Sequence, residues 1–297
     1  MAHLPIFCDH APVAWQDRIL ELEEEARQLG HLNLYDVFAG SKAFKRESEF
    51  WCWLAHTFEY SDDPIKQNCF TRAGEDEFIT QACRLTPLSL VPLGPPGKFS
   101  IWLTRSVHGK SKQNPLGNGS PFAKKGNKLA TFVANGLRLI SWRRCFYLME
   151  QPTSSVLEDH PDVKKALLET GGKRIYCKIG NAGGFYPKPT FLYSNAPWIH
   201  QVYQQFSGGS FSGNVQEARL ARRVGKFVNG GKCLTASAAY PIEFTYIICR
   251  AHFRWVQRLQ AQEYVMLTLG LCPVLQRYMK KIVLLEIYYT ITSFLTV

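Results

Sequence analysis

Apolar residues along this chain follow two spacings, and their alternation predicts an ordered series of strands and helices. Short apolar runs at 32–38, 56–60 and 88–93 are typical of buried strands. Between them, the segments 41–54 and 75–85 carry apolar residues at helical spacing. The order strand, helix, strand, helix, strand predicts an α/β protein with a doubly wound, mostly parallel sheet.

The same patterns extend the prediction in both directions. An apolar stripe over 16–29 that stops at Gly30 predicts a helix before the first strand. The elements expected after the third strand are a long loop at 106–127, a helix at 128–142, a strand at 145–149, a helix at 161–170, a strand at 174–179, a loop at 183–197, a helix at 198–206, a Gly/Ser link at 207–213 and a helix at 236–258.

These elements predict three parts: an N-terminal helical extension (1–30), an α/β domain (31–258) and an apolar tail (259–297). The apolar runs of the tail are shorter than the ~20 residues that a membrane span needs, so we do not expect a membrane anchor. The first residues lack a basic-then-apolar leader, and the cysteines occur singly without Cys-x-x-Cys. We therefore expect an intracellular protein, in the cytoplasm or nucleus, with reduced cysteines and no metal site. The sequence indicates no oligomeric state.

Charge is distributed unevenly along the chain. Residues 1–97 have a net charge of −7 and residues 98–297 a net charge of +18, while 98–144 holds ten basic residues and no acidic one. A basic block of this kind favours a polyanionic partner, most simply nucleic acid, although a solvated basic loop is the alternative. The candidate contacts to nucleic acid are Lys98, Arg105, Lys110, Lys112, Lys124, Lys125 and Lys188.

The predicted strands end in residues that suit a ligand site. The first strand turns at Gly40, the second ends near Glu59, the third ends in Pro95-Pro96-Gly97, and the fourth ends in Glu150-Gln151-Pro152. Ligands of open α/β sheets bind where the carboxyl ends of the strands meet their loops, and an acid after the second strand can accept hydrogen bonds from ribose hydroxyls. Taken singly, each feature also fits an ordinary strand-to-helix turn or a helix cap.

The order of these motifs resembles the cytosine-5 DNA methyltransferases. Their chain order is a Phe-x-Gly loop, an acid, a Pro-Pro-Cys loop and a Glu-Asn strand end. Further motifs are similar to a divergent methylase-like group, and the resemblance spans roughly residues 32–255. These motifs are Asn114-Pro115-Leu116-Gly117-Asn118, Glu150-Gln151-Pro152-Thr153-Ser154-Ser155, Lys188-Pro189-Thr190 and Tyr240-Pro241.

The resemblance implies a Rossmann-like methyltransferase fold with a basic loop insertion and an irregular C-terminal extension. It implies S-adenosylmethionine as cofactor and nucleic acid, DNA first, as partner. The implied cofactor residues are Phe38, Ala39 and Gly40 beside the methionine end, Glu59 at the ribose and Asn68 at the adenine, together with Asp36 and Pro95. Glu150 would hold the cytosine ring, with Pro96 and Gly97 in the loop that carries the nucleophile.

The nucleophile loop departs from the family. The family has cysteine directly after Pro-Pro, and this chain has Gly97. Cytosine C5 becomes nucleophilic only after a thiolate adds at C6, and glycine cannot supply that thiolate. Three interpretations stay open: a nucleic-acid methyltransferase relative that is active or degenerate, a catalytically inactive nucleic-acid-binding protein, and an α/β protein in which these motifs are structural turns.

Overall fold

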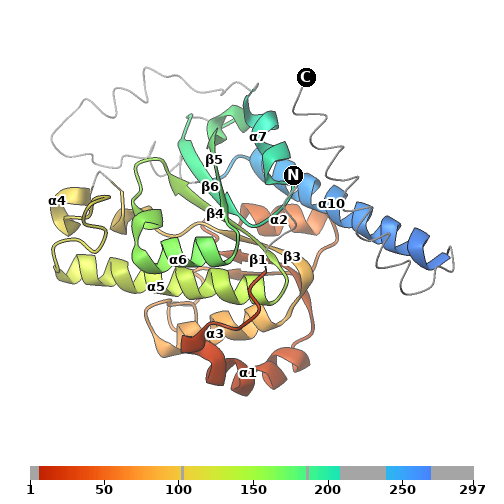
Figure 1. Cartoon of the computed structure of the whole chain (residues 1–297), viewed down its shortest axis with the longest axis horizontal. Coiled ribbons are helices and arrows are strands. Elements are labelled where there is room, and N and C mark those ends of the chain that lie inside the picture. The colour runs from red at the N-terminus through yellow and green to blue at the C-terminus, as the bar shows by residue number, and fades with distance from the viewer. Residues whose placement is uncertain (1–6, 102–103, 185–186, 208–238, 269–297) are drawn as a thin grey trace.

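A computed structural model describes residues 7–101, 104–184, 187–207 and 239–268, and Figure 1 shows a central sheet with helices on both faces. The strands are β1 (Leu32–Val37), β2 (Ala55–Phe58), β3 (Leu85–Leu93), β4 (Phe146–Pro152), β5 (Lys173–Lys178) and β6 (Pro189–Ser194). The α-helices are α1 (Gln16–Gln28), α2 (Ala43–Phe50), α3 (Arg72–Cys83), α4 (Arg105–His108), α5 (Pro121–Trp142), α6 (Pro161–Glu169), α7 (Ile199–Ser207) and α10 (Ile242–Thr268). Short 3-10 turns occur at Val13–Trp15, Gly97–Phe99, Leu157–Asp159 and Ile179–Ala182.

The sheet has the strand order β2-β1-β3-β4-β6-β5. The first four of these strands are parallel, and β6 runs antiparallel to both β4 and β5. From β1 the chain moves outward to β2 and then returns to the other side of β1 as β3. The structure therefore confirms the α/β class and the mostly parallel sheet, and it places a topological switch point between β1 and β3.

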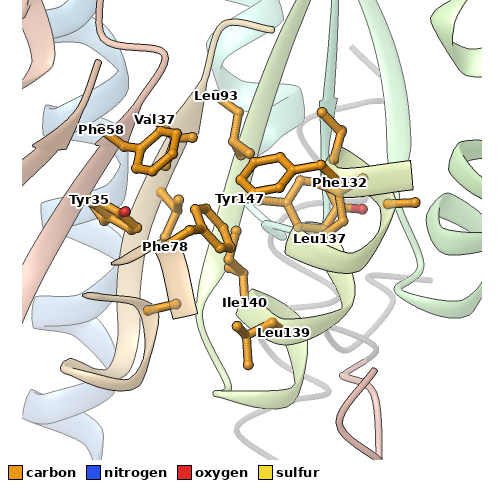
Figure 2. Close-up of a cluster of buried hydrophobic side chains, with 14 of the residues drawn as sticks. Tyr35, Val37, Phe58, Phe78, Leu93, Phe132, Leu137, Leu139, Ile140 and Tyr147 are labelled. Atoms are coloured by element: carbon orange, nitrogen blue, oxygen red, sulfur yellow. The ribbon is translucent and has the colours of Figure 1, made fainter. Parts of the chain in front are cut away.

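One face of the sheet packs against α1, α3, α5 and α6 around an aromatic cluster, shown in Figure 2. Tyr35 and Tyr147 point from β1 and β4 toward Phe78 of α3 and Phe132 of α5, and all four side chains are buried. The rings of Phe78 and Phe132 lie 4.9 Å apart in an edge-to-face arrangement. Burying each such side chain contributes about 1.5–3 kcal/mol, so this cluster fixes the helices against the strands that end at the switch point.

The opposite face packs against α2, α7 and α10. Leu34, Leu90 and Leu148 lie on this face, together with Phe44 of α2 and Phe244 of α10. Because side chains alternate between the two faces of a strand, the same rule that sends Tyr35 to the first face sends Asp36 to this one.

The basic segment is more helical than the sequence pattern predicts. α5 begins at Pro121, whereas we expected a loop over 106–127 and a helix only from residue 128. Ser120 caps the helix by accepting a hydrogen bond from the backbone N–H of Ala123, and proline suits the first helical position. The predicted loop is therefore wrong at its start, where α4 lies, and over 121–127, where Ser-Pro is a helix start.

Two further elements differ from the expectation. The segment predicted as a loop at 183–197 contains β6, whose backbone pairs with β4 and β5. α10 continues to Thr268, beyond the expected end at 258. Apart from residue 207, the predicted link at 207–213 lies outside the described residues, as does the chain from 269 onward. Among the described helices, none has the length and apolarity needed to cross a bilayer.

Candidate functional site

The loops that follow β1, β2, β3 and β4 meet at one edge of the sheet, which we call the carboxyl edge. The backbone N–H of Gly94, just after β3, donates to the carbonyl of Val37 at the end of β1 at 3.0 Å. The two strands stay joined up to their last residues, and their loops separate directly beyond them. The switch point therefore opens at this edge.

The loop after β1 has an unusual backbone. Phe38, Gly40 and Lys42 have positive φ angles of 56°, 48° and 55°. For the two non-glycine residues this left-handed region costs of order 1–3 kcal/mol each and is concentrated at functional sites. A Cβ atom added to Gly40 would meet no heavy atom within 4 Å, so the backbone there faces open space.

Glu59 crosses from the end of β2 to this loop. Its Oε2 accepts the backbone N–H of Gly40 at 2.8 Å. Its own backbone N–H donates to Oε1 of Gln67 at 2.6 Å, which fixes the residue from the other side. The other carboxylate oxygen has only long contacts of 3.4 Å from Ser61. The structure thus brings together the glycine and the acid that the sequence singled out separately.

The remaining predicted cofactor residues lie around this contact. Ala39 is buried and Phe38 is half-buried in the β1 loop. Asn68 is half-buried in the segment before α3, where its Oδ1 accepts the backbone N–H of Phe70 at 3.2 Å. Pro95 is buried at the end of β3.

The Pro-Pro-Gly loop is tied to β4 by Gln151. Its Nε2 donates to the carbonyl of Pro95 at 2.8 Å, and its Oε1 accepts the hydroxyl of Ser155 at 2.8 Å. Ser155 in turn contacts the hydroxyl of Ser100 at 3.0 Å. Gln151 is only 1% exposed, so this buried network holds two loops of the carboxyl edge together. The sequence reasoning gave Gln151 no role.

Position 97 has an apolar neighbourhood. A Cβ atom added to Gly97 would lie 3.2 Å from Cγ2 of Ile101 and 3.7 Å from Cγ of Pro152.

Burial raises the pKa of the Cys177 thiol to about 12, and the charge of Glu150 adds to this effect. Burial also raises the pKa of Cys69 and of Cys145 to about 12. None of these three thiols is an activated nucleophile, because the thiolate is the reactive form.

Glu150 is held by three donors from two later segments, the start of β6 and the residues before α10. Lys188 Nζ lies 3.5 Å from its Oε1, and the Thr190 hydroxyl donates to the same oxygen at 3.4 Å. The Tyr240 hydroxyl donates to Oε2 at 3.2 Å. Lys188 Nζ also lies 4.9 Å above the Tyr240 ring. The carboxylate is thus buried but surrounded by hydrogen-bond donors and a cation.

Tyr240 links this cluster to the switch point. A Cβ atom at Gly94 would lie 2.9 Å from the Tyr240 hydroxyl, so a side chain at position 94 would displace the ring. Burial raises the pKa of Tyr240, and the charges of Glu150 and Asp36 raise it further. Tyr240 therefore remains a neutral phenol and a hydrogen-bond donor. Its Tyr-Pro sequence was visible in the motif order, but nothing in the sequence showed that it reaches Glu150.

Asp36 lies on the same face of the sheet, one residue before β1 ends. It is 2% exposed, and its Oδ2 has no hydrogen-bond partner. Burial raises the pKa of this carboxyl to about 7, although the backbone N–H of Lys45 opposes the rise. Asp36 is therefore a carboxyl group that is largely neutral below pH 7.

Five of the predicted nucleic-acid contacts form an exposed basic surface. They lie on the 3-10 turn after β3, on α4 and its following loop, and on the first turns of α5, beside the carboxyl edge (Figure 1). The five are Lys98, Arg105, Lys112, Lys124 and Lys125, and none forms an ion pair with a carboxylate of the described residues. Lys125 Nζ lies 4.5 Å above the ring of Phe70, which joins this surface to the segment around Asn68.

Two predicted contacts do not belong to that surface. Lys110 is 4% exposed and lies against Gly126 of α5, and burial lowers its pKa to about 8. Because it is buried, we correct its assignment as a surface contact. Lys188 is mostly buried against Glu150.

No family model matches this chain, and no curated protein sequence matches it. Within the part of the chain that the structure describes, no group of three or more metal-ligating side chains comes together. The functional argument therefore depends on the geometry of the carboxyl edge.

Proposed function

We propose that this chain is an S-adenosylmethionine-binding relative of the nucleic-acid methyltransferases. The observation that carries the proposal is the contact between Gly40, in the loop after β1, and Glu59, at the end of the neighbouring strand β2. It combines a glycine turn that faces open space with a carboxylate at the end of the neighbouring strand. This is the arrangement by which α/β sheets bind the ribose of a nucleoside cofactor.

The chemistry of Glu59 suits a ribose. Its Oε2 already accepts a hydrogen bond, and its Oε1 has only long contacts. A ribose diol presents two neighbouring hydroxyl donors, which one carboxylate can accept together. Hydrogen bonds to a charged group contribute about 1.5–3 kcal/mol each, so Glu59 would supply a large part of the affinity.

The acceptor side of the proposal is Glu150 with its donors. A nucleobase edge could replace Tyr240 or Thr190 as the hydrogen-bond partner of this carboxylate. The proposal does not include cytosine-5 methylation, because position 97 has no side chain and the thiol of Cys177, whose pKa is also raised by the charge of Glu150, is held protonated by burial.

Calorimetric titration of the chain with S-adenosylmethionine and S-adenosylhomocysteine tests the proposal. We expect micromolar binding that Glu59→Ala weakens about tenfold or more, as the loss of one or two charged hydrogen bonds requires. Glu25→Ala, on the exposed face of α1, is the matched control and should bind as the unmodified chain does. Absence of binding at millimolar ligand, with a normal melting temperature, would refute the proposal.

A second candidate function is nucleic-acid binding without methyl transfer. It is favoured by the exposed basic surface and by the contact between Lys125 and Phe70, since basic and aromatic side chains together bind single strands. We expect the affinity for a labelled DNA or RNA strand to fall steeply as salt rises. Lys124→Glu with Lys125→Glu should weaken binding, whereas Arg258→Glu on α10 should not. Binding that is independent of salt would exclude this function, and a chain that binds neither ligand would leave the motifs as structural turns.

A further inference from the structure

β3 contains a bulge at its beginning, far from the carboxyl edge. Leu32 of β1 pairs with Leu85, whereas Leu34 pairs with Leu90. These two pairs are two residues apart on β1 but five residues apart on β3. Residues 86–89 of β3 are therefore not paired with β1. Leu88 within the bulge has a φ of 69°, which residues other than glycine rarely adopt. Bulges of this kind re-aim side chains and are frequent beside functional sites.

The bulge forms one wall of a cavity of about 210 Å³, and α10 forms another. Trp53, Phe253 and Val256 supply apolar surface to it. The ring centroids of Trp53 and Phe253 lie 6.3 Å apart, so the two rings are neighbours and form one continuous aromatic wall. Because it lies where β1 and β3 begin, this cavity is separate from the carboxyl edge, where they end.

The lining of the cavity carries no formal charge. Its polar members are amides, hydroxyls and His252, and no aspartate, glutamate, lysine or arginine contributes. His252 is 3% exposed, and burial lowers its pKa to about 3, so the ring is neutral at physiological pH. Its Nδ1 has no hydrogen-bond partner. Such a lining favours a neutral ligand, because a charged one would lose its hydration without gaining a counter-charge.

Two side-chain amides stand at the rim. Gln257 and Gln260 are three residues apart on α10, so they project from the same side of the helix. Both are exposed, and neither amide bonds to another described residue. Asn33 differs, since its Oδ1 accepts the backbone N–H of Leu54 at 3.1 Å. An amide donates and accepts at once, which matches a planar ligand edge with a neighbouring donor and acceptor, as glutamine matches adenine.

We propose that this cavity binds a small neutral aromatic ring with a hydrogen-bond donor and acceptor on one edge. Nucleobases and aromatic amides belong to this class. The ring lies against Trp53 and Phe253, and Gln257 and Gln260 bond its edge. The volume is below the ~300–1,000 Å³ of sites for drug-sized ligands, which indicates a single small ring. The inference does not depend on the function proposed for the carboxyl edge.

Nicotinamide and nicotinate form a matched pair of probes, because they share one ring and differ in an amide against a carboxylate. We expect the full chain to bind nicotinamide at least tenfold more tightly than nicotinate, by calorimetry and by quenching of tryptophan fluorescence. The titration is repeated with Glu59→Ala, and the nicotinamide affinity should stay unchanged. Loss of nicotinamide binding in this variant would place nicotinamide at the carboxyl edge and overturn the inference.

Two variants locate the binding. Gln257→Leu, on an exposed helix surface, should weaken nicotinamide about fivefold to tenfold, as the loss of one hydrogen bond predicts. Val256→Trp should fill the cavity and abolish binding, while the melting temperature reports that the chain is folded. Gln28→Leu on α1 is the control and should have no effect. Equal affinity for the two probes, or binding that survives both variants in α10, would overturn the proposal.

Discussion

Asp36 makes the stability of this protein depend on pH in a direction opposite to that of most carboxylates. The pKa of its carboxyl rises from an ordinary 3.8 to about 7, mainly because the group is buried. Since the folded-state pKa lies above the unfolded value, the folded chain binds a proton that the unfolded chain releases. The contribution to stability is therefore complete below pH 3.8 and is lost as pH rises through about 7.

The size of this effect follows from the two pKa values. Each tenfold change in a proton equilibrium corresponds to about 1.4 kcal/mol, so the whole rise corresponds to about 4 kcal/mol. Between pH 5 and pH 8 the loss amounts to about 3 kcal/mol, which is an upper value because the site can relax or admit water. Replacing Asp36 with asparagine removes the ionisation and keeps an oxygen that can accept the N–H of Lys45.

Urea unfolding of Asp36→Asn and of the unmodified chain, followed by tryptophan fluorescence at pH 5, 6, 7 and 8, measures the effect. We expect the variant to gain stability relative to the unmodified chain as pH rises, by up to about 3 kcal/mol at pH 8 compared with pH 5. Asp9→Asn, at an exposed position, serves as the control and should show no such trend.

The reasoning fails if the difference in unfolding free energy between Asp36→Asn and the unmodified chain is the same at all four pH values. A difference that decreases as pH rises would also contradict it, because the folded-state pKa would then lie below the unfolded one. In either case burial would not be the dominant influence on the pKa of the Asp36 carboxyl.

Three further predictions concern Gly94, Gln151 and His252. Gly94→Ala places a Cβ atom 2.9 Å from the Tyr240 hydroxyl and should lower the unfolding free energy by about 1–3 kcal/mol in urea titration; an unchanged midpoint would contradict the close approach. Gln151→Leu leaves the buried carbonyl of Pro95 without its donor and should lower the unfolding free energy by about 1–3 kcal/mol, whereas Gln28→Leu should be neutral in the same urea titration. Burial lowers the pKa of His252 from 6.5 to about 3, so the contribution of His252 to stability should fall by about 2 kcal/mol from pH 7 to pH 5, and His252→Phe should gain that amount relative to the unmodified chain over the same interval in urea titration.

The carboxyl edge could be predicted from the sequence because local signals coincide there. The apolar runs of β1 to β4 are short and each ends in glycine, proline or an acid, and parallel strands place such ends at one edge. Gly40 and Glu59 illustrate this, since the structure joins them at 2.8 Å. Their role in binding a cofactor stays a prediction.

The surroundings of Glu150 could not be predicted, because they depend on contacts between distant parts of the chain. Tyr240 lies 90 positions away from the carboxylate to which it donates. Lys188 and Thr190 reach it only because β6 pairs with β4, and the Lys-Pro-Thr sequence at the start of β6 looked like part of a loop. Lys110 was expected to contact nucleic acid because it lies in a basic segment rich in glycine and serine, but its side chain is buried.

The late position of β6 and Tyr240 in the chain sets a condition on how the protein folds during synthesis. Glu150 leaves the ribosome with β4, before the start of β6 and well before Tyr240. A nascent chain that stops short of these residues has the complete parallel part of the sheet, but its carboxylate on β4 has none of the three donors that surround it in the finished protein. Since a buried charge without partners is strongly unfavourable, this end of β4 can close only after most of the chain has been made.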